Sequence, residues 1–590
     1  MSQKSSIVQI VKNYLSTHDN YLSLNPDISK CFTQEVFDWD FIFNEDSFSH
    51  DEYFFYNLFD GCQFIHSSVP GEDFLKNHIP WNVVSNNIIR NIQNINNEFN
   101  RFKPKDLVKQ TNIFAFDNSK NVCLAKKPTQ NKRRSNLINK ETVIILPIDD
   151  EEKFQINDHD TVPIDWKKMC IYPKFFRCIT DYVSEKILNN IVLVDKKKQK
   201  FMLWKDGDVL TPRDYKPSCK YLKETMSNIG EFDFFVTRMM DEVITRWLKK
   251  RHEQKQLELG KEVPFKHYNS IFDFSNICFI IHTTDTDIFL FSLYFLEYIK
   301  YKLNIDTDKK LPNIIIRQPW KAKTIINVKN VYTSLRNNLE KDNNCGDLKT
   351  IIRSYVMTML SCGNDLLPNL HNVVFKIYHE VFVKYRHLFS HSLLSMNIKS
   401  DDPKYFHQCL INGQSFKTLY FLVYAEKLIL SKDKKKLNDY VNDPEGLELF
   451  ITNYVTQKDL KDHRKKIQGF DNIKARLIII NIMLYSIEHS LRNVKGCKKD
   501  SLSQLMLPEF THINLFEEYK QKVNPDYFKK AYEMGIITEK KCIFYSRYIA
   551  LDKFDQEKEI DGLIELAKNV YYNLHMNYFA YNRFRIQNKN

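Results

Sequence analysis

Acidic side chains stand just after, or beside, several short apolar segments of this chain. In order along the sequence these segments are VFDWDFIF with Asp38 and Asp40, NIFAFDNS with Asp117, NIGEFDFF with Glu231 and Asp233, IIHTTDTD with Asp285 and Asp287, and SCGNDLLP with Asp365. Carboxylates gathered outside the carboxyl ends of parallel strands repel one another unless cations neutralise them. Such hard oxygen ligands suit Mg²⁺ or Mn²⁺, and two ions of this kind activate water for hydrolysis of a phosphodiester.

A simpler interpretation holds for each acid taken alone. An Asp after a strand usually caps a helix or forms a turn. For Asp285, which follows Thr284, capping is favoured over metal ligation by about four to one. The metal hypothesis therefore depends on the whole set of acids and on its order.

The elements that must position these acids can be predicted from the apolar pattern. Helices are expected at residues 86–102, 234–251 and 351–360, with another from the HTTDTD segment to about Tyr301. Short buried strands are expected at residues 112–116 and 277–281. Buried strands alternating with helices predict an α/β fold with a parallel sheet and helices on both faces. Beyond about residue 371 the pattern is mainly helical.

Composition excludes several classes of protein. The 590 residues include 43% hydrophobic and 27% charged side chains, which argues against general disorder, and 13 glycines exclude a collagen-like chain. The 12 cysteines form no CxxC pair, so a paired-cysteine zinc site is not expected. We expect no membrane partner and a soluble, intracellular, cytoplasmic protein, with the nucleus not excluded, because no apolar stretch is long and uncharged enough to span a bilayer.

The charge and aromatic content fit a nucleic-acid partner. The formal net charge is +13 and 14% of residues are aromatic, which suits electrostatic attraction and base stacking. An AT-rich genome, such as that of a large DNA virus or a protist, would give the same bias.

The acidic motifs, in their order, resemble those of the 5′-to-3′ exoribonuclease (Xrn) family, a branch of the flap-endonuclease-like, PIN-like nucleases. That family's first motif is a strand, an Asp and a hydrophobic run, to which VFDWDFIFN is similar. FKPKDLVKQTNIFAFDNSKNVCLAKKPTQNKRRS resembles the second motif and the basic helix after it. Gly230-Glu231-Phe232-Asp233 departs from Gly-Glu-x-Glu only in its last acid, Asp285-Thr286-Asp287 matches Asp-x-Asp, and the string from Gly363 to Pro368 matches Gly-Asn-Asp-x-Leu-Pro. This last motif is the most specific one, because flap endonucleases differ there.

The resemblance spans roughly residues 30 to 370 and implies a fold and a metal site. The implied architecture is a PIN-like nuclease domain over residues 1–370, with an insertion at about 135–225, and a mainly helical region over residues 371–590. The implied ligands of two Mg²⁺ or Mn²⁺ ions are Asp38, Asp117, Glu231, Asp233, Asp285, Asp287 and Asp365. Every one of these positions holds a carboxylate, which favours an active enzyme.

A basic cluster follows Asp117. Family members bind a 5′-monophosphate through the pattern K-x₃-Q-x₂-R-R, and the similar residues here are Lys126, Gln130, Arg133 and Arg134. Cations and an amide on successive helical turns suit a dianionic terminal phosphate. Lys127 is a rival for Lys126, because the gap after Asp117 is longer than in the family. A solvated basic face or a nuclear-localisation run is the alternative interpretation.

Three departures from the family pattern stand out. Asp-Gly after the second strand is Asp117-Asn118, the family's amino-terminal Gly-x-Pro-x-Phe-Phe-Arg-Trp motif is missing at residue 1, and a His that stacks on the terminal base is replaced by Asn44. His282, by contrast, is interpreted as a packing residue at a strand end rather than as a general base.

The resemblance implies a divalent-metal-dependent 5′→3′ exoribonuclease acting on single-stranded RNA with a 5′-monophosphate. Two alternatives remain open: a flap nuclease or exonuclease acting on DNA, and a non-catalytic nucleic-acid-binding scaffold with the same fold. The identity of the metal, the RNA targets and any protein partner are not defined by the sequence.

Overall fold

The structure is a computed structural model, and it describes the part of the chain that contains the predicted strands. The described residues are 7–18, 26–33, 38–43, 50–99, 107–117, 155–170, 173–193, 198–206, 208–212, 232–260, 272–317, 324–341, 351–362, 374–386 and 423.

These residues form one eight-stranded sheet in the order β1-β8-β7-β6-β2-β3-β4-β5. The five inner strands β7, β6, β2, β3 and β4 are parallel, whereas β1, β8 and β5 pair antiparallel with their neighbours. The strands are β1 (Phe32–Thr33), β2 (Tyr53–Asp60), β3 (Val108–Ala115), β4 (Gln199–Lys205), β5 (Asp208–Leu210), β6 (Ile277–His282), β7 (Asn313–Arg317) and β8 (Ile325–Asn327). The protein is therefore an α/β protein with a mixed, mostly parallel sheet.

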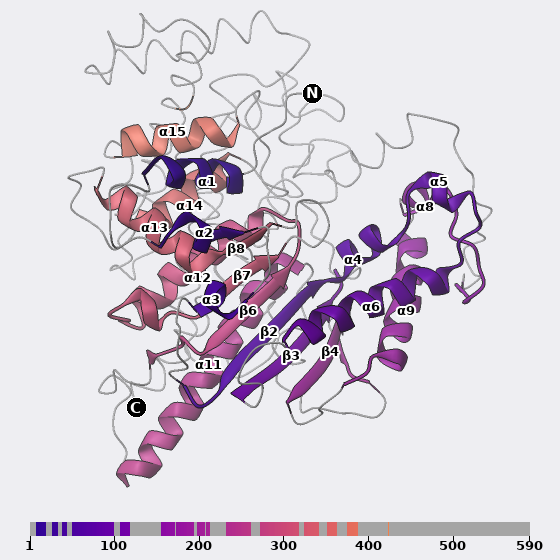
Figure 1. Ribbon diagram of the computed structural model, residues 1–590, viewed down its shortest axis with the longest axis horizontal. Helices are drawn as coiled ribbons and strands as arrows, with labels where there is room; N and C mark the ends of the chain where they lie inside the picture. Colours follow the sequence, from indigo (N-terminus) through magenta and orange to yellow (C-terminus); the bar gives the residue numbers. More distant parts are fainter. Residues whose placement is uncertain are drawn as a thin grey trace, which may run out of the picture.

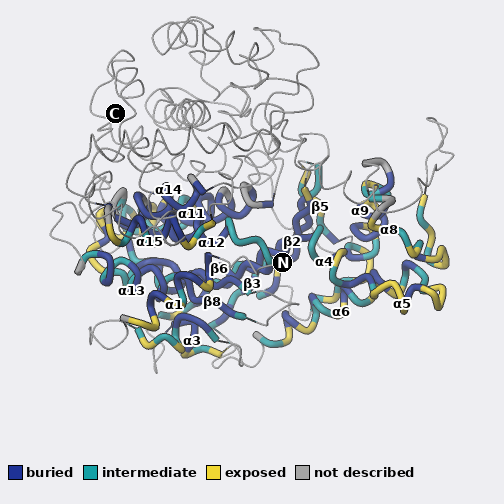
Figure 2. The backbone as a smooth tube through the Cα atoms, turned by 90° about the horizontal axis from the view of Figure 1, so that it is seen from above, coloured by how far each residue is buried: buried dark blue, intermediate teal, exposed yellow. Residues whose placement is uncertain are grey.

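Helices cover both faces of this sheet. Figure 2 shows α11, α12 and α14 on one side of the strands and α3 and α6 on the other. The described helices are α1 (Ile7–His18), α2 (Ile28–Cys31), α3 (Trp39–Phe43), α4 (Gly61–Ser68), α5 (Glu72–Leu75), α6 (Trp81–Phe99), α8 (Trp166–Met169), α9 (Pro173–Asn190), α11 (Phe232–Leu259), α12 (Asp287–Lys302), α13 (Val328–Lys341), α14 (Ile351–Ser361) and α15 (Phe375–Tyr385), with a 3₁₀ turn at Asp308–Lys310.

The two faces of the sheet are packed by different aromatic side chains. On one face Phe64 of α4 lies with its ring 5.4 Å from the rings of both Phe59 on β2 and Phe114 on β3. On the other face Phe235 of α11 stacks on Trp204 of β4 at 4.8 Å. The innermost strand β6 is buried at every position, which is typical of a parallel strand covered by helices on both sides.

Most of the helices and strands expected from the sequence are present. Helix α6 covers the helix predicted at 86–102 but begins at Trp81, and α11, α12 and α14 cover the other predicted helices. Strands β3 and β6 confirm the two predicted strands. The apolar run at residues 35–43 contains the short helix α3.

The range 135–225, predicted as an insertion, is in part integral to the sheet. Its described residues include α9 and the strands β4 and β5, and β4 pairs in parallel with β3. Of the region predicted as helical from residue 371, α15 and Val423 are described; the rest lies outside the described residues.

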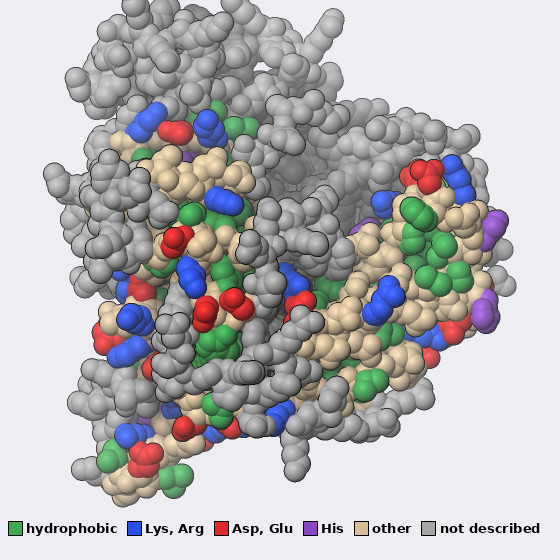
Figure 3. Space-filling model, viewed as in Figure 1, with side chains coloured by type: hydrophobic (Ala, Val, Ile, Leu, Met, Phe, Trp, Pro, Cys, Tyr) green, Lys and Arg blue, Asp and Glu red, His purple; other side chains and the backbone are tan. Residues whose placement is uncertain are grey.

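On the face seen in Figure 3 the acidic and basic side chains of the described residues are interspersed. Apolar side chains gather over α5 and α8, in the part of the molecule that projects to the right, where Phe74 is 66% and Ile164 is 49% exposed. Within the ranges given above, no helix is both long and apolar enough to cross a membrane.

Candidate functional site: the carboxyl edge of the sheet

Three neighbouring strands, β3, β2 and β6, end together at one edge of the sheet. Asp60, the last residue of β2, pairs in register with Ala115, and Phe59 pairs with His282. Because the three strands are parallel (Figure 1), the residues that follow them meet at the same edge. We call this place the acidic edge and define it by Asp60, Asp117 and Asp285.

Asp60 is the buried member of the acidic edge and is only 7% exposed. Its Oδ1 accepts a hydrogen bond from the main-chain N–H of Gln63 at 3.1 Å, which caps α4. Its Oδ2 accepts a hydrogen bond from the Thr283 hydroxyl at 3.3 Å. No described Lys or Arg pairs with this carboxylate. The predicted site residues do not include Asp60, although YFFYNLFD is an apolar strand ending in Asp, like NIFAFD.

Gly61 brings the start of α4 close to the end of β3. A Cβ at this position would lie 2.7 Å from the ring of Phe116 and 2.8 Å from the carbonyl oxygen of Ala115. Only a residue without a side chain allows so close an approach. The turn between β2 and α4 is therefore held near the residues that precede Asp117.

Asp117 connects the acidic edge to helix α11. It is exposed, and its Oδ1 accepts a hydrogen bond from the main-chain N–H of Phe232 at 3.0 Å. Phe232 is the first residue of α11 and stands between Glu231 and Asp233 in the sequence. A carboxylate at a helix start is stabilised by the N-terminal N–H groups and by the positive end of the helix dipole.

Asp285 follows β6 and lies just before α12. The N–H of Asp287, in the first turn of this helix, donates to Asp285 Oδ1 at 3.0 Å, while the N–H of Asp285 donates to the Thr283 hydroxyl at 3.1 Å. Asp285 therefore forms a turn before α12, as the simpler interpretation allows, whereas the N-cap position itself is held by Thr286 without a side-chain cap bond. This turn does not exclude a second role for Asp285, since a carboxylate has further lone pairs to share.

The negative charges of the acidic edge shift the pKa of its buried member, Asp60. Burial raises the pKa of Asp60, and the negative charges of Asp117 and Asp285 raise it further, to about 8. Hydrogen bonds from Gln63 and Thr283 act in the opposite direction without offsetting these effects. At neutral pH Asp60 therefore holds a proton unless a cation takes its place.

The carboxylate oxygens of the acidic edge are the type of ligand that a hard divalent cation prefers. Within the described part of the chain, however, no group of three or more His, Cys, Asp or Glu side chains lies close enough to hold an ion. Further predicted ligands have no described side chain: Glu231 and Asp365 lie outside the described residues, and Asp233 is described as backbone of α11 only. Asp287 lies beside Asp285, in the first turn of α12.

Asp38, predicted as the first metal ligand, does not lie at the acidic edge. It is exposed and accepts a hydrogen bond from the N–H of Phe41 at 2.8 Å, so it caps the short helix α3. The next residue, Trp39, packs against the ring of Tyr53 at 4.6 Å. Tyr53 begins β2, and seven residue steps of about 3.3 Å along the strand separate it from Asp60. The structure thus places Asp38 near the amino end of β2, whereas Asp60 occupies its carboxyl end.

The predicted 5′-phosphate ligands Lys126, Gln130, Arg133 and Arg134, and the rival Lys127, lie outside the described residues. The interpretation of His282 as a packing residue is confirmed. Its ring is buried and stacks on Phe59 at 4.5 Å, and burial, together with the charge of Arg317, lowers its pKa well below the ordinary value.

No protein-family model matches this chain, and no curated protein is significantly similar to it. The fold and the site by themselves define an α/β protein whose mostly parallel sheet carries acidic side chains outside the carboxyl ends of three adjacent strands.

Proposed function

We propose that the protein is a divalent-metal-dependent 5′→3′ exoribonuclease that degrades single-stranded RNA with a 5′-monophosphate, built on a PIN-like fold. The observation that carries the metal-dependent step is Asp60: a buried carboxylate beside two other acids, with no described cation to neutralise it. The preference for RNA and for a 5′-monophosphate is drawn from the resemblance of the motifs.

Asp60 replaces Asp38 as the first metal-binding acid in this proposal. The family's first motif is a strand, an Asp and a hydrophobic run, and β2 followed by α4 supplies that order with Asp60 at its centre. The base-stacking His of the family falls six residues after the first acid. Counted from Asp38 this offset gives Asn44, but counted from Asp60 it gives His66, so the changed assignment removes one of the departures from the family.

His66 has the surroundings of an aromatic packing residue. Its ring lies 5.0 Å from Trp166 and 6.1 Å from Phe176. Burial lowers the pKa of His66, and the charge of Lys167 lowers it further. His66 is exposed, and a neutral imidazole beside other aromatic rings suits base stacking better than proton transfer.

The chain's own residues hold the ions and the substrate. Asp60, Asp117 and Asp285 provide the described oxygen donors, and the resemblance adds Glu231, Asp233, Asp287 and Asp365. Lys126, Gln130, Arg133 and Arg134 would hold the terminal phosphate. When bound, Mg²⁺ or Mn²⁺ supplies neutralisation of charge and activation of water at the scissile phosphate.

The test compares substrates that differ in one feature. The full chain is incubated in Mg²⁺ with RNA carrying a 5′-monophosphate, the same RNA with a 5′-triphosphate or 5′-hydroxyl, and DNA of the same sequence. We expect release of nucleotides from the 5′-monophosphorylated RNA only, and none in EDTA. Equal or preferred cleavage of DNA would favour the DNA nuclease, and binding without cleavage of any substrate would favour the scaffold.

A further inference from the structure

The side chain of Gln63 connects the start of α4 to the loop that follows β6. It lies in the first turn of α4, three residues after Asp60. Its Oε1 accepts two hydrogen bonds from Thr284, one from the main-chain N–H at 2.6 Å and one from the hydroxyl at 2.7 Å. Its own main-chain N–H donates to Asp60 Oδ1 at 3.1 Å.

Gln63 therefore contacts Asp60 directly and is linked to Asp285 only through Thr284. The main-chain bond fixes the Asp60 carboxylate, and the side-chain bonds fix Thr284, the residue directly before Asp285. A parallel link runs through Thr283, whose hydroxyl donates to Asp60 Oδ2 and accepts from the N–H of Asp285. The start of α4 and the loop after β6 are thereby cross-linked at the place where the charge of Asp285 raises the pKa of Asp60.

We propose that Gln63 is a positioning residue that fixes the spacing between Asp60 and Asp285 and thereby sets the affinity of the acidic edge for a divalent cation. The proposal rests on the function proposed above, in which these acids bind metal. When a cation displaces the proton of Asp60, two negative carboxylates must share one edge of the sheet, and ligands already cross-linked before binding cost less to organise. A neutral amide supplies the necessary acceptor without adding another negative charge.

The test distinguishes the contribution of the hydrogen-bond acceptor Oε1 of Gln63 from that of the rest of its side chain. Gln63→Met keeps the length and approximate volume but removes Oε1, whereas Gln63→Glu retains an oxygen that accepts both bonds from Thr284. The main-chain bond to Asp60 is available in both variants. Thr284→Val is a milder change, because it removes the hydroxyl donor and leaves the main-chain N–H.

Two readouts are measured on the full chain: the Mg²⁺ concentration that half-saturates RNA cleavage, and binding of Mn²⁺ alone, measured by titration without RNA. We expect Gln63→Met to raise the half-saturating Mg²⁺ and to weaken Mn²⁺ binding at least tenfold, with the rate at saturating Mg²⁺ within about threefold of wild type. Thr284→Val should weaken binding less than Gln63→Met. Gln63→Glu should bind Mn²⁺ within about threefold of wild type or more tightly.

A merely structural role predicts a different pattern. Gln63→Met would then lower the melting temperature in EDTA and reduce the rate without changing the half-saturating Mg²⁺, and this result would overturn the proposal. Wild-type affinity for Mn²⁺ in Gln63→Met, or equal weakening in Gln63→Met and Gln63→Glu, would overturn it too. Failure of the wild type to cleave RNA while binding Mn²⁺ would refute the proposed reaction alone, because the Mn²⁺ titrations still test Gln63.

Discussion

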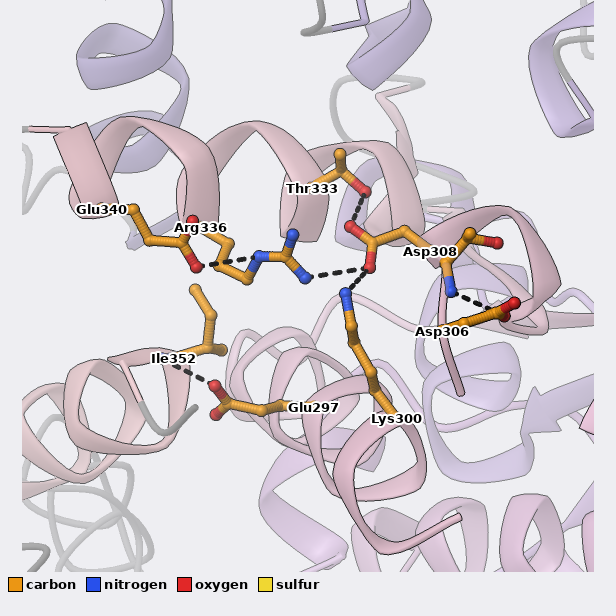
Figure 4. A network of polar contacts seen from close by, with 9 residues as sticks. Glu297, Lys300, Asp306, Asp308, Thr333, Arg336, Glu340 and Ile352 are labelled. Carbon is orange, nitrogen blue, oxygen red and sulfur yellow. Dashed lines mark hydrogen bonds and ion pairs between the residues drawn. The ribbon is translucent and has the colours of Figure 1, made fainter. Parts of the chain in front are cut away.

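Two acids of this protein, the partly buried Asp308 and the buried Asp60, have opposite surroundings. The side chain of Asp308 is 13% exposed and forms ion pairs with Lys300 and with Arg336, the latter at 2.9 Å, while Thr333 donates to it at 3.1 Å (Figure 4). Asp60 is 7% exposed and receives only two neutral hydrogen-bond donors from described residues, with two acids nearby.

The difference in their surroundings indicates that the two acids have different roles. Asp308 joins the turn before β7 to α12 and α13, and its charge is offset within the fold, as expected of a structural ion pair. Burial raises the pKa of Asp60, and the neighbouring acids raise it further. Ionising this carboxyl group therefore lowers the stability of the folded protein. A buried acid with a strongly raised pKa is often found at a functional site.

The largest expected effect on stability comes from breaking the compensated pair. Asp308→Asn leaves Lys300 without the acid it shares with Arg336, although Arg336 keeps its ion pair with Glu340, and should lower the free energy of unfolding by about 3 kcal/mol. Urea denaturation measures the loss. Asp306→Asn is the matched control, because Asp306 pairs with Lys310 at the surface, where ion pairs contribute little. Equal stability of the two variants would show that the ion pairs of Asp308 contribute no more than the surface ion pair of Asp306.

The free energy of unfolding should depend on pH, because the pKa of Asp60 is raised in the folded protein. An unfolded Asp ionises near 3.8, whereas the folded pKa is about 8. Between these values the folded protein keeps a proton that the unfolded chain has lost, so its stability falls as pH rises, and the penalty is complete above pH 8. From pH 5 to pH 7 this amounts to a loss on the order of 2 to 3 kcal/mol.

Unfolding in EDTA checks this prediction by comparing wild type with Asp60→Asn at both pH values, since other titrating groups cancel in the difference. The stability advantage of Asp60→Asn should be larger at pH 7 than at pH 5. A constant difference between the two proteins would show that Asp60 ionises normally.

A smaller effect is expected from the glycine that brings Asp60 to the sheet edge. Gly61→Ala places a Cβ 2.7 Å from the Phe116 ring and should cost on the order of 1 to 3 kcal/mol. Gly71→Ala is the control, because its added Cβ has open space apart from the adjoining residues, so its cost should be well below that of Gly61→Ala. Thermal unfolding compares the two, and equal shifts would mean that the close approach at Gly61 is relaxed without cost.

The sequence was sufficient to predict the α/β class and the strands whose apolar runs are unbroken. It did not identify β2, because Asn57 interrupts the run YFFYNLFD. Asn57 is buried but still forms a hydrogen bond, since its side-chain amide donates to Asn112 on β3 at 2.8 Å. Such a pair across two strands is formed only in the folded sheet and leaves no local signal.

For a related reason the sequence could not show which of two acids, Asp38 or Asp60, lies at the carboxyl edge of the sheet. The segments around Asp38 and around Asp60 both place an Asp in apolar surroundings, and only strand pairing shows which one lies at the carboxyl edge. The run at residues 35–43 folds in part as a short helix against the amino end of β2. Asp117 and Asp285 were found correctly at the ends of strands, because their strands are short, apolar and bounded by polar residues.

The central claim is tested most directly by the rate of RNA cleavage in Asp60→Asn and Asp38→Asn, measured side by side with wild type on 5′-monophosphorylated RNA in Mg²⁺. We expect Asp60→Asn to reduce the rate by about 10³-fold or more, the order of effect for a group that stabilises developing charge at the reacting centre. Asp38→Asn, which preserves a cap on α3, should cleave at the wild-type rate. Full activity in Asp60→Asn, with loss of activity in Asp38→Asn, would contradict the account.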